Sequence, residues 1–165
     1  DQLLNAVELT KVRNIKVVIV GSYYYSENIK DEYQNKLHEM AKKMDNKIIF
    51  AGYIGQDELP YLYSASDIVV LPSMWEEPAG LTMIEALACG KPVITTKSGG
   101  IPEYMGDCAV ILEKNDSLPA DIALAIDKLL TDKQMYQLYS EKGIKRVKEN
   151  FTKAIYLERL CEILK

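Results

Sequence analysis

The sequence predicts an α/β fold: a Rossmann-like, doubly wound parallel sheet with helices on both faces. Five short apolar runs rich in Val and Ile have the length of buried strands. Stretches with apolar residues at helical spacing lie between them. A length of 165 residues with 48% hydrophobic residues is enough for one well-buried domain and too little for two of usual size. We therefore expect a single domain over residues 1–165.

The strands and helices are expected to alternate along the chain. The buried strands are expected at 15–20, 47–51, 68–71, 92–95 and 109–112. The first two are joined by a helix whose apolar face consists of Tyr33, Leu37, Met40, Ala41 and Met44. Helices over 57–64 and 81–89 follow the second and third strands, and apolar stripes predict three further helices over 119–130, 133–148 and 152–164.

The expected helix over 81–89 carries one charge, Glu85, among apolar residues. Gly90 is placed to end this helix and Pro92 prevents its continuation. An ionised carboxylate in such surroundings costs several kcal/mol, of the order of an unpaired buried ion, unless donors or a ligand meet it. We therefore expect a polar partner for Glu85.

The start of the same helix has the features of a phosphate site. Pro78 and Gly80 shape a tight approach, so the first free N–H groups of the helix face whatever lies above them. Glu77 comes just before, with seven residues between it and Glu85. A phosphate-bearing ligand with hydroxyl groups, such as a nucleotide sugar, fits this pattern. In the alternative interpretation, Glu77 is a solvated loop residue and Glu85 pairs with a structural Lys or Arg.

Four segments in a fixed order resemble the C-terminal domain of retaining GT-B glycosyltransferases, the large family-four group. They are ASDIVVLPS at 65–73, EPAG at 77–80, EALACGKPVI at 85–94 and GGIPE at 99–103. The similarity runs through nearly all of the chain. It implies a Rossmann-like donor-binding domain whose parent is a hexosyltransferase.

The resemblance also implies roles for individual residues. Glu77 matches the acid that binds hydroxyls of the donor sugar and is our candidate at the catalytic centre, where it orients the sugar without acting as a nucleophile. Glu85 matches the acid that binds the nucleotide ribose. The backbone amides around Ala79, Gly80, Leu81 and Thr82 match those that contact the sugar and the diphosphate, in agreement with the helix-end argument.

Three further residues match positions at the donor cleft. Tyr53 and Ile54 match residues that flank the nucleobase, and Gly21 matches a glycine that faces the cleft. Ordinary strand-end turns explain these three residues about as well.

By the same resemblance, the parent has parts that these residues lack. Residues 1–9 resemble a helix that in the family follows the first strand, at the centre of the sheet. That strand leads into a Gly-Arg and a Lys-Gly pair, just upstream of the helix, that neutralise the diphosphate. The N-terminal domain that binds the acceptor is also absent. We therefore expect a fragment that binds its donor weakly and turns over little, because transfer depends on holding donor and acceptor together.

Composition excludes several other classes. The net charge is −4 with dispersed Lys and Arg, which argues against nucleic-acid binding. Three cysteines without metal-ligand spacing indicate reduced thiols in a cytoplasmic protein. We find no signal peptide and no apolar run approaching about 20 residues. The absent acceptor domain leaves peripheral contact with the inner face of a membrane open.

No metal or bound cofactor is expected. The sequence contains no Asp-x-Asp for a metal-bridged diphosphate, and no dinucleotide or P-loop glycine motif. Weaker candidates for the donor site are Lys97, Trp75, Gly99 with Gly100, and the Tyr23–Tyr25 cluster, each of which also has a plain structural explanation. His38 is expected at the surface.

The favoured function is transfer of a hexose, with retention, from a nucleoside diphosphate sugar to a glycan or glycolipid acceptor. A UDP-sugar is the favoured donor. The first alternative is a non-catalytic nucleotide-sugar-binding or regulatory module. The second is a scaffold whose two Glu residues make only structural pairs, in which case Glu85→Gln alters stability without altering ligand affinity.

Overall fold

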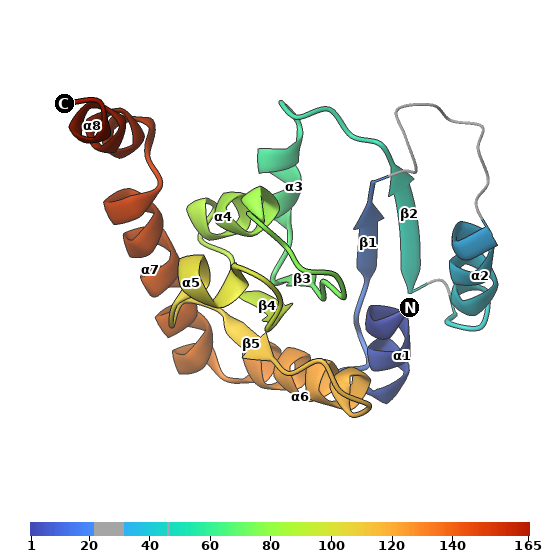
Figure 1. Cartoon of the computed structure of the whole chain (residues 1–165). Coiled ribbons are helices and arrows are strands. Elements are labelled where there is room, and N and C mark those ends of the chain that lie inside the picture. The colour runs from blue at the N-terminus through green and yellow to red at the C-terminus, as the bar shows by residue number, and fades with distance from the viewer. Residues whose placement is uncertain (22–31, 46) are drawn as a thin grey trace.

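The computed structural model describes residues 1–21, 32–45 and 47–165 (Figure 1). The Tyr23–Tyr25 cluster lies outside the described residues. The strands are β1 (Val17–Val20), β2 (Ile48–Gly52), β3 (Val69–Leu71), β4 (Val93–Thr96) and β5 (Val110–Leu112). The helices are α1 (Gln2–Leu9), α2 (Glu32–Ala41), α3 (Leu59–Ala65), α4 (Leu81–Ala88), α5 (Ile101–Met105), α6 (Leu118–Thr131), α7 (Lys133–Asn150) and α8 (Lys153–Ile163).

The predicted α/β fold is confirmed, and all five expected strands are present. Each strand pair is parallel, as short Val- and Ile-rich runs separated by helices predict. Helix α5 was not predicted as a helix, because its Gly-Gly-x-Pro start is also typical of a turn. Pro102 stands in its first turn, where the missing N–H has no intrahelical partner to lose.

The strands form two separate sheets. One pairs β1 with β2, and the other has the order β3-β4-β5. Among the described residues no strand hydrogen-bonds across from one sheet to the other, and Figure 1 shows β1 and β2 standing apart from β3. We refer to these regions as the two-stranded half and the three-stranded half.

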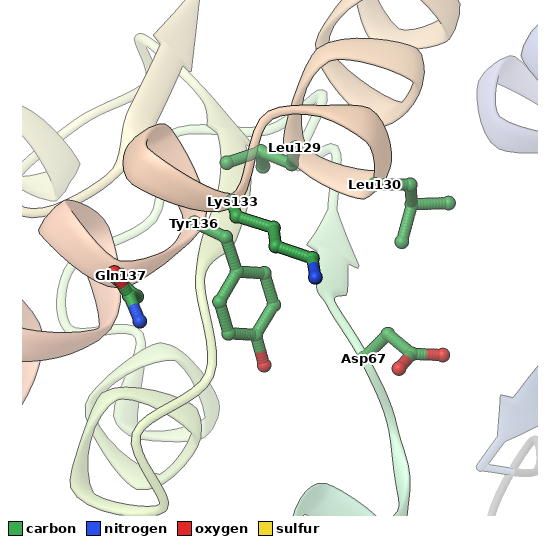
Figure 2. Close-up of a pocket in the computed structure, with 6 residues that line it drawn as sticks. All are labelled: Asp67, Leu129, Leu130, Lys133, Tyr136 and Gln137. Atoms are coloured by element: carbon green, nitrogen blue, oxygen red, sulfur yellow. The ribbon is translucent and has the colours of Figure 1, made fainter.

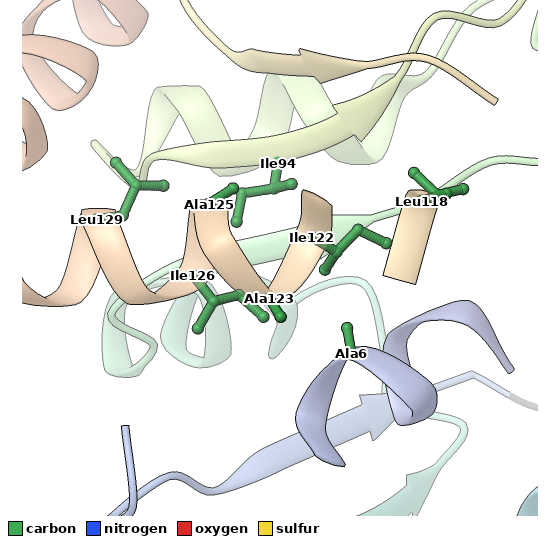
Figure 3. Close-up of a cluster of buried hydrophobic side chains, with 8 residues drawn as sticks. All are labelled: Ala6, Ile94, Leu118, Ile122, Ala123, Ala125, Ile126 and Leu129. Atoms are coloured by element: carbon green, nitrogen blue, oxygen red, sulfur yellow. The ribbon is translucent and has the colours of Figure 1, made fainter. Parts of the chain in front are cut away.

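The three-stranded half contains the core. Every residue of β4 is buried, and its two apolar side chains pack into two clusters on opposite faces of the sheet. Ile94 packs into the first cluster, on the face covered by α6 and α1 (Figure 3). Val93 packs into the second, with Leu87 of α4 and Ile101 of α5. Helices therefore cover both faces, as predicted.

The two-stranded half is much less buried than predicted. Val18 and Ile49 are each 47% exposed, and the burial of β1 and β2 alternates along each strand. The prediction of buried strands is therefore wrong for one face of this sheet. Helix α2 also buries none of its residues, and Tyr33 on its expected apolar face is 49% exposed. Val/Ile content predicts a strand but not whether a second layer covers it.

Helix α1 ties the two halves together. Leu4, Ala6 and Val7 are buried, and α1 packs along α6. The carboxylate of Asp127 on α6 accepts hydrogen bonds from the backbone N–H of Lys11, 3.0 Å from each oxygen, and from Thr10. The segment leading into β1 is thereby fixed to the larger core.

Candidate functional site

The loop between β3 and α4 is held by hydroxyl groups at the end of β4. Thr95, Thr96 and Ser98 are at most 2% exposed and donate to the backbone carbonyls of Leu71, Ser73 and Trp75, in that order. These hydroxyl groups supply hydrogen-bond donors to backbone carbonyls at the start of the loop. The loop that carries Glu77 is therefore fixed along its first half.

A carboxylate and a lysine hold the middle of the loop. The backbone N–H of Gly99 donates to Glu76 Oε2 at 2.6 Å, and Lys114 Nζ lies 2.7 Å from Glu76 Oε1 and 3.0 Å from Ser98 Oγ. The hydrogen bond from Lys114, followed by that from Gly99, holds the pKa of Glu76 below its usual value. The loops after β3, β4 and β5 are thereby linked just before Glu77.

Glu77 is fixed through its backbone and not through its carboxylate. Its carbonyl oxygen accepts from the N–H of Gly100 at 2.9 Å. Gly99 approaches so closely that a Cβ there would lie 2.5 Å from this oxygen. The Glu77 side chain is half-buried, and its carboxylate accepts no hydrogen bond from any described residue. The position of Glu77 is therefore set by its backbone contacts.

At the start of α4, some backbone N–H groups donate hydrogen bonds within the protein and others have no acceptor among the described residues. The N–H of Gly80 donates to the hydroxyl of Tyr104 at 2.5 Å, and that of Leu81 lies 3.0 Å from the carbonyl of Ala79. No hydrogen bond from the N–H of Thr82 or of Ala79 is found within the described part of the chain. A ligand at this helix end would therefore meet the N–H groups of Thr82 and Ala79 first.

Glu85 has a polar partner, as expected, but it is not a lysine or arginine. The hydroxyl of Tyr63 on α3 donates to Glu85 Oε2 at 3.1 Å. Burial, and then this hydrogen bond, raise the pKa of Tyr63 well above its usual value, so the phenol stays protonated and remains a donor. The carboxylate itself is half-buried. Its other oxygen, Oε1, has no partner among the described residues.

Gly21, Tyr53 and Ile54 lie in the two-stranded half, at the carboxyl ends of β1 and β2. The N–H of Gly21 donates to the carbonyl of Gly52 at 2.8 Å, and its φ of 124° suits glycine. The Tyr53 side chain is 60% exposed. The structure brings Glu77, the α4 N-terminus and Glu85 together around one helix. It places Gly21, Tyr53 and Ile54 in the separate two-stranded sheet, at the ends of β1 and β2.

The weaker candidates have ordinary surroundings. Lys97 pairs with Glu113 at 2.9 Å, with both side chains exposed. Trp75 is 65% exposed, and its carbonyl anchors the loop described above. His38 is exposed, as predicted, with its ring 4.0 Å from that of Phe50. These contacts account for the residues without a ligand.

A hollow of about 280 Å³ lies at the opposite end of β3 from Glu77. Figure 2 shows Lys133 and Tyr136 of α7 beside Asp67, which precedes β3. Burial and the charge of Asp67 raise the pKa of Tyr136. Ligands of open parallel sheets bind outside the carboxyl ends of the strands, so this hollow is on the wrong edge.

A second hollow, of about 370 Å³, lies between the first turn of α4 and the junction of α7 with α8. Leu81 and Ile84 line it from α4. Its exposed lining is mainly apolar, although Lys153 and Arg159 also border it.

Metal-ligand clusters and membrane spans were both sought in the described part of the chain. No group of three or more His, Cys, Asp or Glu side chains is placed there to hold a metal ion. No described helix is both long and apolar enough to cross a membrane.

Sequence reasoning missed the residues that position the two acids: Tyr63, Tyr104, Glu76 and Lys114. Each acts through a contact with a residue distant in sequence. Tyr63 and Glu85, for example, are 22 positions apart. The sequence predicted a helix over 57–64 but could not show that Tyr63 faces Glu85 of α4. Adjacency to Glu77 was the one available signal, and it pointed to Glu76.

Comparisons with known proteins agree on one family. The family model described as "Glycosyl transferases group 1" matches residues 1–146. The lipopolysaccharide 1,2-N-acetylglucosaminetransferase of Salmonella typhimurium is 35% identical over 127 residues, 76% of this chain and 33% of the relative. The mannosylfructose-phosphate synthase of Agrobacterium fabrum is 32% identical over 122 residues, 72% of this chain and 26% of the relative. The chain spans about a third or less of the length of these curated relatives.

Solved structures give the same fold. Anabaena HepE in complex with UDP-glucose has a TM-score of 0.85 at 23% identity, covering 99% of this chain and 44% of that one. The C-terminal domain of LpcC, a glycosyl transferase group 1 family protein from Francisella tularensis, has a TM-score of 0.78 at 28% identity. That match covers 92% of this chain and 78% of the other.

Proposed function

The chain belongs to the glycosyl transferases group 1 family, and on that premise we propose that it is the donor-binding half of a retaining hexosyltransferase. The donor is a nucleoside diphosphate sugar, with UDP as the favoured nucleotide. In the reaction the bond from the sugar C1 to the diphosphate breaks, and the acceptor hydroxyl forms the new bond on the same face.

The main support for this proposal is that the Glu77 carboxylate pairs with no described residue, while the groups around it in the loop are hydrogen-bonded. Neighbouring carbonyls are bonded to Ser98 and Thr96, and Glu76 is held by Lys114 and Gly99. The carboxylate of Glu77, in contrast, has no such partner in the described part of the chain. A fixed backbone carrying an unpaired carboxylate is what orientation of a polar ligand requires. It supports a role for Glu77 in binding the donor sugar hydroxyls at the catalytic centre.

The remaining donor contacts follow from the same helix. Glu85 binds the ribose, and the N–H groups of Ala79 and Thr82 receive the diphosphate, with Gly80 and Leu81 shaping the turn between them. We assign no metal to this site, since backbone N–H groups and basic residues of the parent carry the charge. Gly21, Tyr53 and Ile54 border the nucleobase from the two-stranded half.

The test is calorimetric titration of the chain with UDP, GDP and ADP to millimolar concentration. We expect selective binding of one nucleotide, which Glu85→Ala abolishes. Glu77→Gln should leave that affinity unchanged and remove any gain given by an attached sugar, such as that of UDP-glucose over UDP. The matched control is Glu103→Gln, an exposed acid on α5 that should change neither.

Two outcomes argue against the proposal. Failure of all three nucleotides to bind a folded chain contradicts it and favours the scaffold, in which Glu85 pairs only with Tyr63. Nucleotide binding in a parent that transfers no sugar favours the non-catalytic module instead.

We also propose that a parent protein supplies an acceptor domain and one more parallel strand between β1 and β3. The separation of the two sheets and the share of the relatives that this chain spans support this. The isolated chain then binds donor weakly and transfers little. Extension of the chain upstream should raise both nucleotide affinity and melting temperature, and unchanged values would count against the added strand.

The setting we propose is the cytoplasm, with contact at the inner face of a membrane through the acceptor domain. The acceptor is then a glycan or glycolipid. The name of the Salmonella relative, a lipopolysaccharide glycosyltransferase, supports this class of product. Activity of the parent with a panel of glycan and glycolipid acceptors tests it.

A further inference from the structure

We propose that Tyr63 is a positioning residue for Glu85 and sets how strongly the nucleotide ribose is recognised. This inference rests on the proposed function, because it takes Glu85 as the ribose-binding acid. It assigns a role in ligand selectivity to a side chain on α3, a helix that carries none of the predicted donor contacts.

The contact joins two neighbouring helices. Tyr63 lies in the last turns of α3, Glu85 lies in the middle of α4, and the two helices pack against each other. The Tyr63 hydroxyl donates to Glu85 Oε2 at 3.1 Å, and its ring packs against the second core cluster, which includes Met83 and Leu87. Because the core holds the ring, the position of the Tyr63 hydroxyl is fixed.

The bond divides the two oxygens of the carboxylate between protein and ligand. Oε2 is taken by Tyr63, while Oε1 has no donor in the described part of the chain. A glutamate side chain loses rotamer freedom when it binds a ligand, and a prior hydrogen bond removes part of that cost. The hydrogen bond from Tyr63 therefore fixes the Glu85 side chain before the ligand binds, so that less conformational entropy is lost when the ribose hydroxyls bind it.

Tyr63 remains a donor over the working pH range. Burial raises the pKa of the phenol, and the adjacent Glu85 carboxylate adds to the effect. The proton of this hydrogen bond therefore stays on the tyrosine oxygen and points to the carboxylate.

The experiment compares Tyr63→Phe with the wild-type chain by calorimetry. The probes are whichever of UDP, GDP and ADP binds most tightly, and its 2′,3′-dideoxy counterpart, which lacks both ribose hydroxyls. We expect the wild-type chain to prefer the ribonucleotide. Tyr63→Phe should reduce that preference by about threefold to tenfold, the effect of one hydrogen bond, without changing the affinity for the dideoxy form.

Two further variants separate positioning from structure. Tyr61→Phe alters a tyrosine on the same helix that is 76% exposed, and it should leave both affinities unchanged. In a Glu85→Ala background, Tyr63→Phe should have no additional effect on the preference, because there is no carboxylate left to position.

Each other result counts against the inference. A preference unchanged in Tyr63→Phe overturns it while leaving the proposed function intact. Equal weakening of both nucleotides shows a purely structural role for Tyr63 and overturns it as well. If the wild-type chain binds the ribonucleotide and its dideoxy form equally, Glu85 does not bind the ribose hydroxyls. If it binds none of UDP, GDP and ADP, the proposed function itself is contradicted.

Discussion

The two halves of the molecule are built from similar strands but differ in how firmly they hold their loops. In the three-stranded half every residue of β4 is buried and its terminal hydroxyls fix the loop before α4. In the two-stranded half Val18 and Ile49 are each 47% exposed, and Tyr53 at the end of β2 is 60% exposed. Strand-forming residues alone do not make a rigid site.

The difference matters for the proposed ligand. Glu77 and Glu85, assigned to the sugar and the ribose, stand on the well-packed half, where geometry must be accurate for transfer. Gly21, Tyr53 and Ile54, assigned to the base, stand on the half with fewer buried contacts. We therefore expect substitutions in the first half to reduce stability and binding together, and those in the second to have smaller effects.

The largest contrast should come from core truncation. Leu87 of α4 is fully buried, and a Cβ at Gly143 of α7 would lie only 2.8 Å from its Cδ2. Leu87→Ala should lower the free energy of unfolding by roughly 3–4 kcal/mol through lost burial and the cavity it leaves. Ile49→Ala, in the half-exposed strand, should cost about 1 kcal/mol. Urea unfolding of both variants measures this, and equal losses would remove the distinction between the halves.

The next contrast compares two glycines with positive φ. Gly99 has φ of 50° and a Cβ there would lie 2.5 Å from the Glu77 carbonyl oxygen, whereas Gly52 has φ of 70° with open space around it. Gly52→Ala should cost about 1 kcal/mol, the strain of a left-handed residue. Gly99→Ala should cost roughly 2–3 kcal/mol, because the backbone of Glu77 must also move.

The same pair has a binding readout. If Gly99 seats Glu77, Gly99→Ala should reduce the gain in affinity that an attached sugar gives over the bare nucleotide, measured by calorimetry. Gly52→Ala serves as the matched control for backbone strain. A sugar contribution that survives Gly99→Ala would show that this close approach does not position Glu77.

The same division marks what the sequence could predict. Periodicity and Val/Ile content located all five strands in both halves, and the lone charge in an apolar helix pointed to Glu85. Burial of β1 and β2 was predicted wrongly for one face of their sheet, because a local pattern does not say whether a second layer lies above it. The separation into two sheets depends on which strands pair, and a local sequence pattern does not determine that pairing.

The loop anchors show a further limit of the sequence. Thr96 and Ser98 are ordinary residues after a strand, and nothing local indicates that they bond the carbonyls of Ser73 and Trp75 more than twenty positions away. The motif around Glu77 located the candidate site. The contacts that hold it required the fold.

A smaller effect is expected from removing one of these hydroxyls. Thr96→Val keeps the shape of a fully buried side chain and leaves the Ser73 carbonyl without its donor. This should cost about 1–2 kcal/mol in urea unfolding. Thr131→Val removes a hydroxyl that bonds a carbonyl at the exposed end of α6, where water can replace it, and should be nearly neutral. Similar losses would mean that buried anchoring is not what distinguishes this loop.

The smallest contrast concerns two ion pairs and depends on pH. The Lys114 side chain, which pairs with Glu76, is only 23% exposed, whereas those of Lys42, just after α2, and Glu39 of α2 are 70% and 68% exposed. The pKa of each acid is lowered by its lysine, so each pair stabilises the fold above the ordinary pKa of glutamate and is lost as pH falls through the lowered value.

Melting temperatures of Lys114→Met and Lys42→Met between pH 7 and pH 3 test this contrast. The deficit of Lys114→Met should be largest at neutral pH and shrink below about pH 4, as Glu76 is protonated in the wild-type chain too. Lys42→Met should show little deficit at any pH, because water solvates both of its charges. A deficit of Lys114→Met that persists at pH 3 would mean that Lys114 acts through Ser98 or packing, so that the loop beneath Glu77 is held by the buried hydroxyls and not by charge.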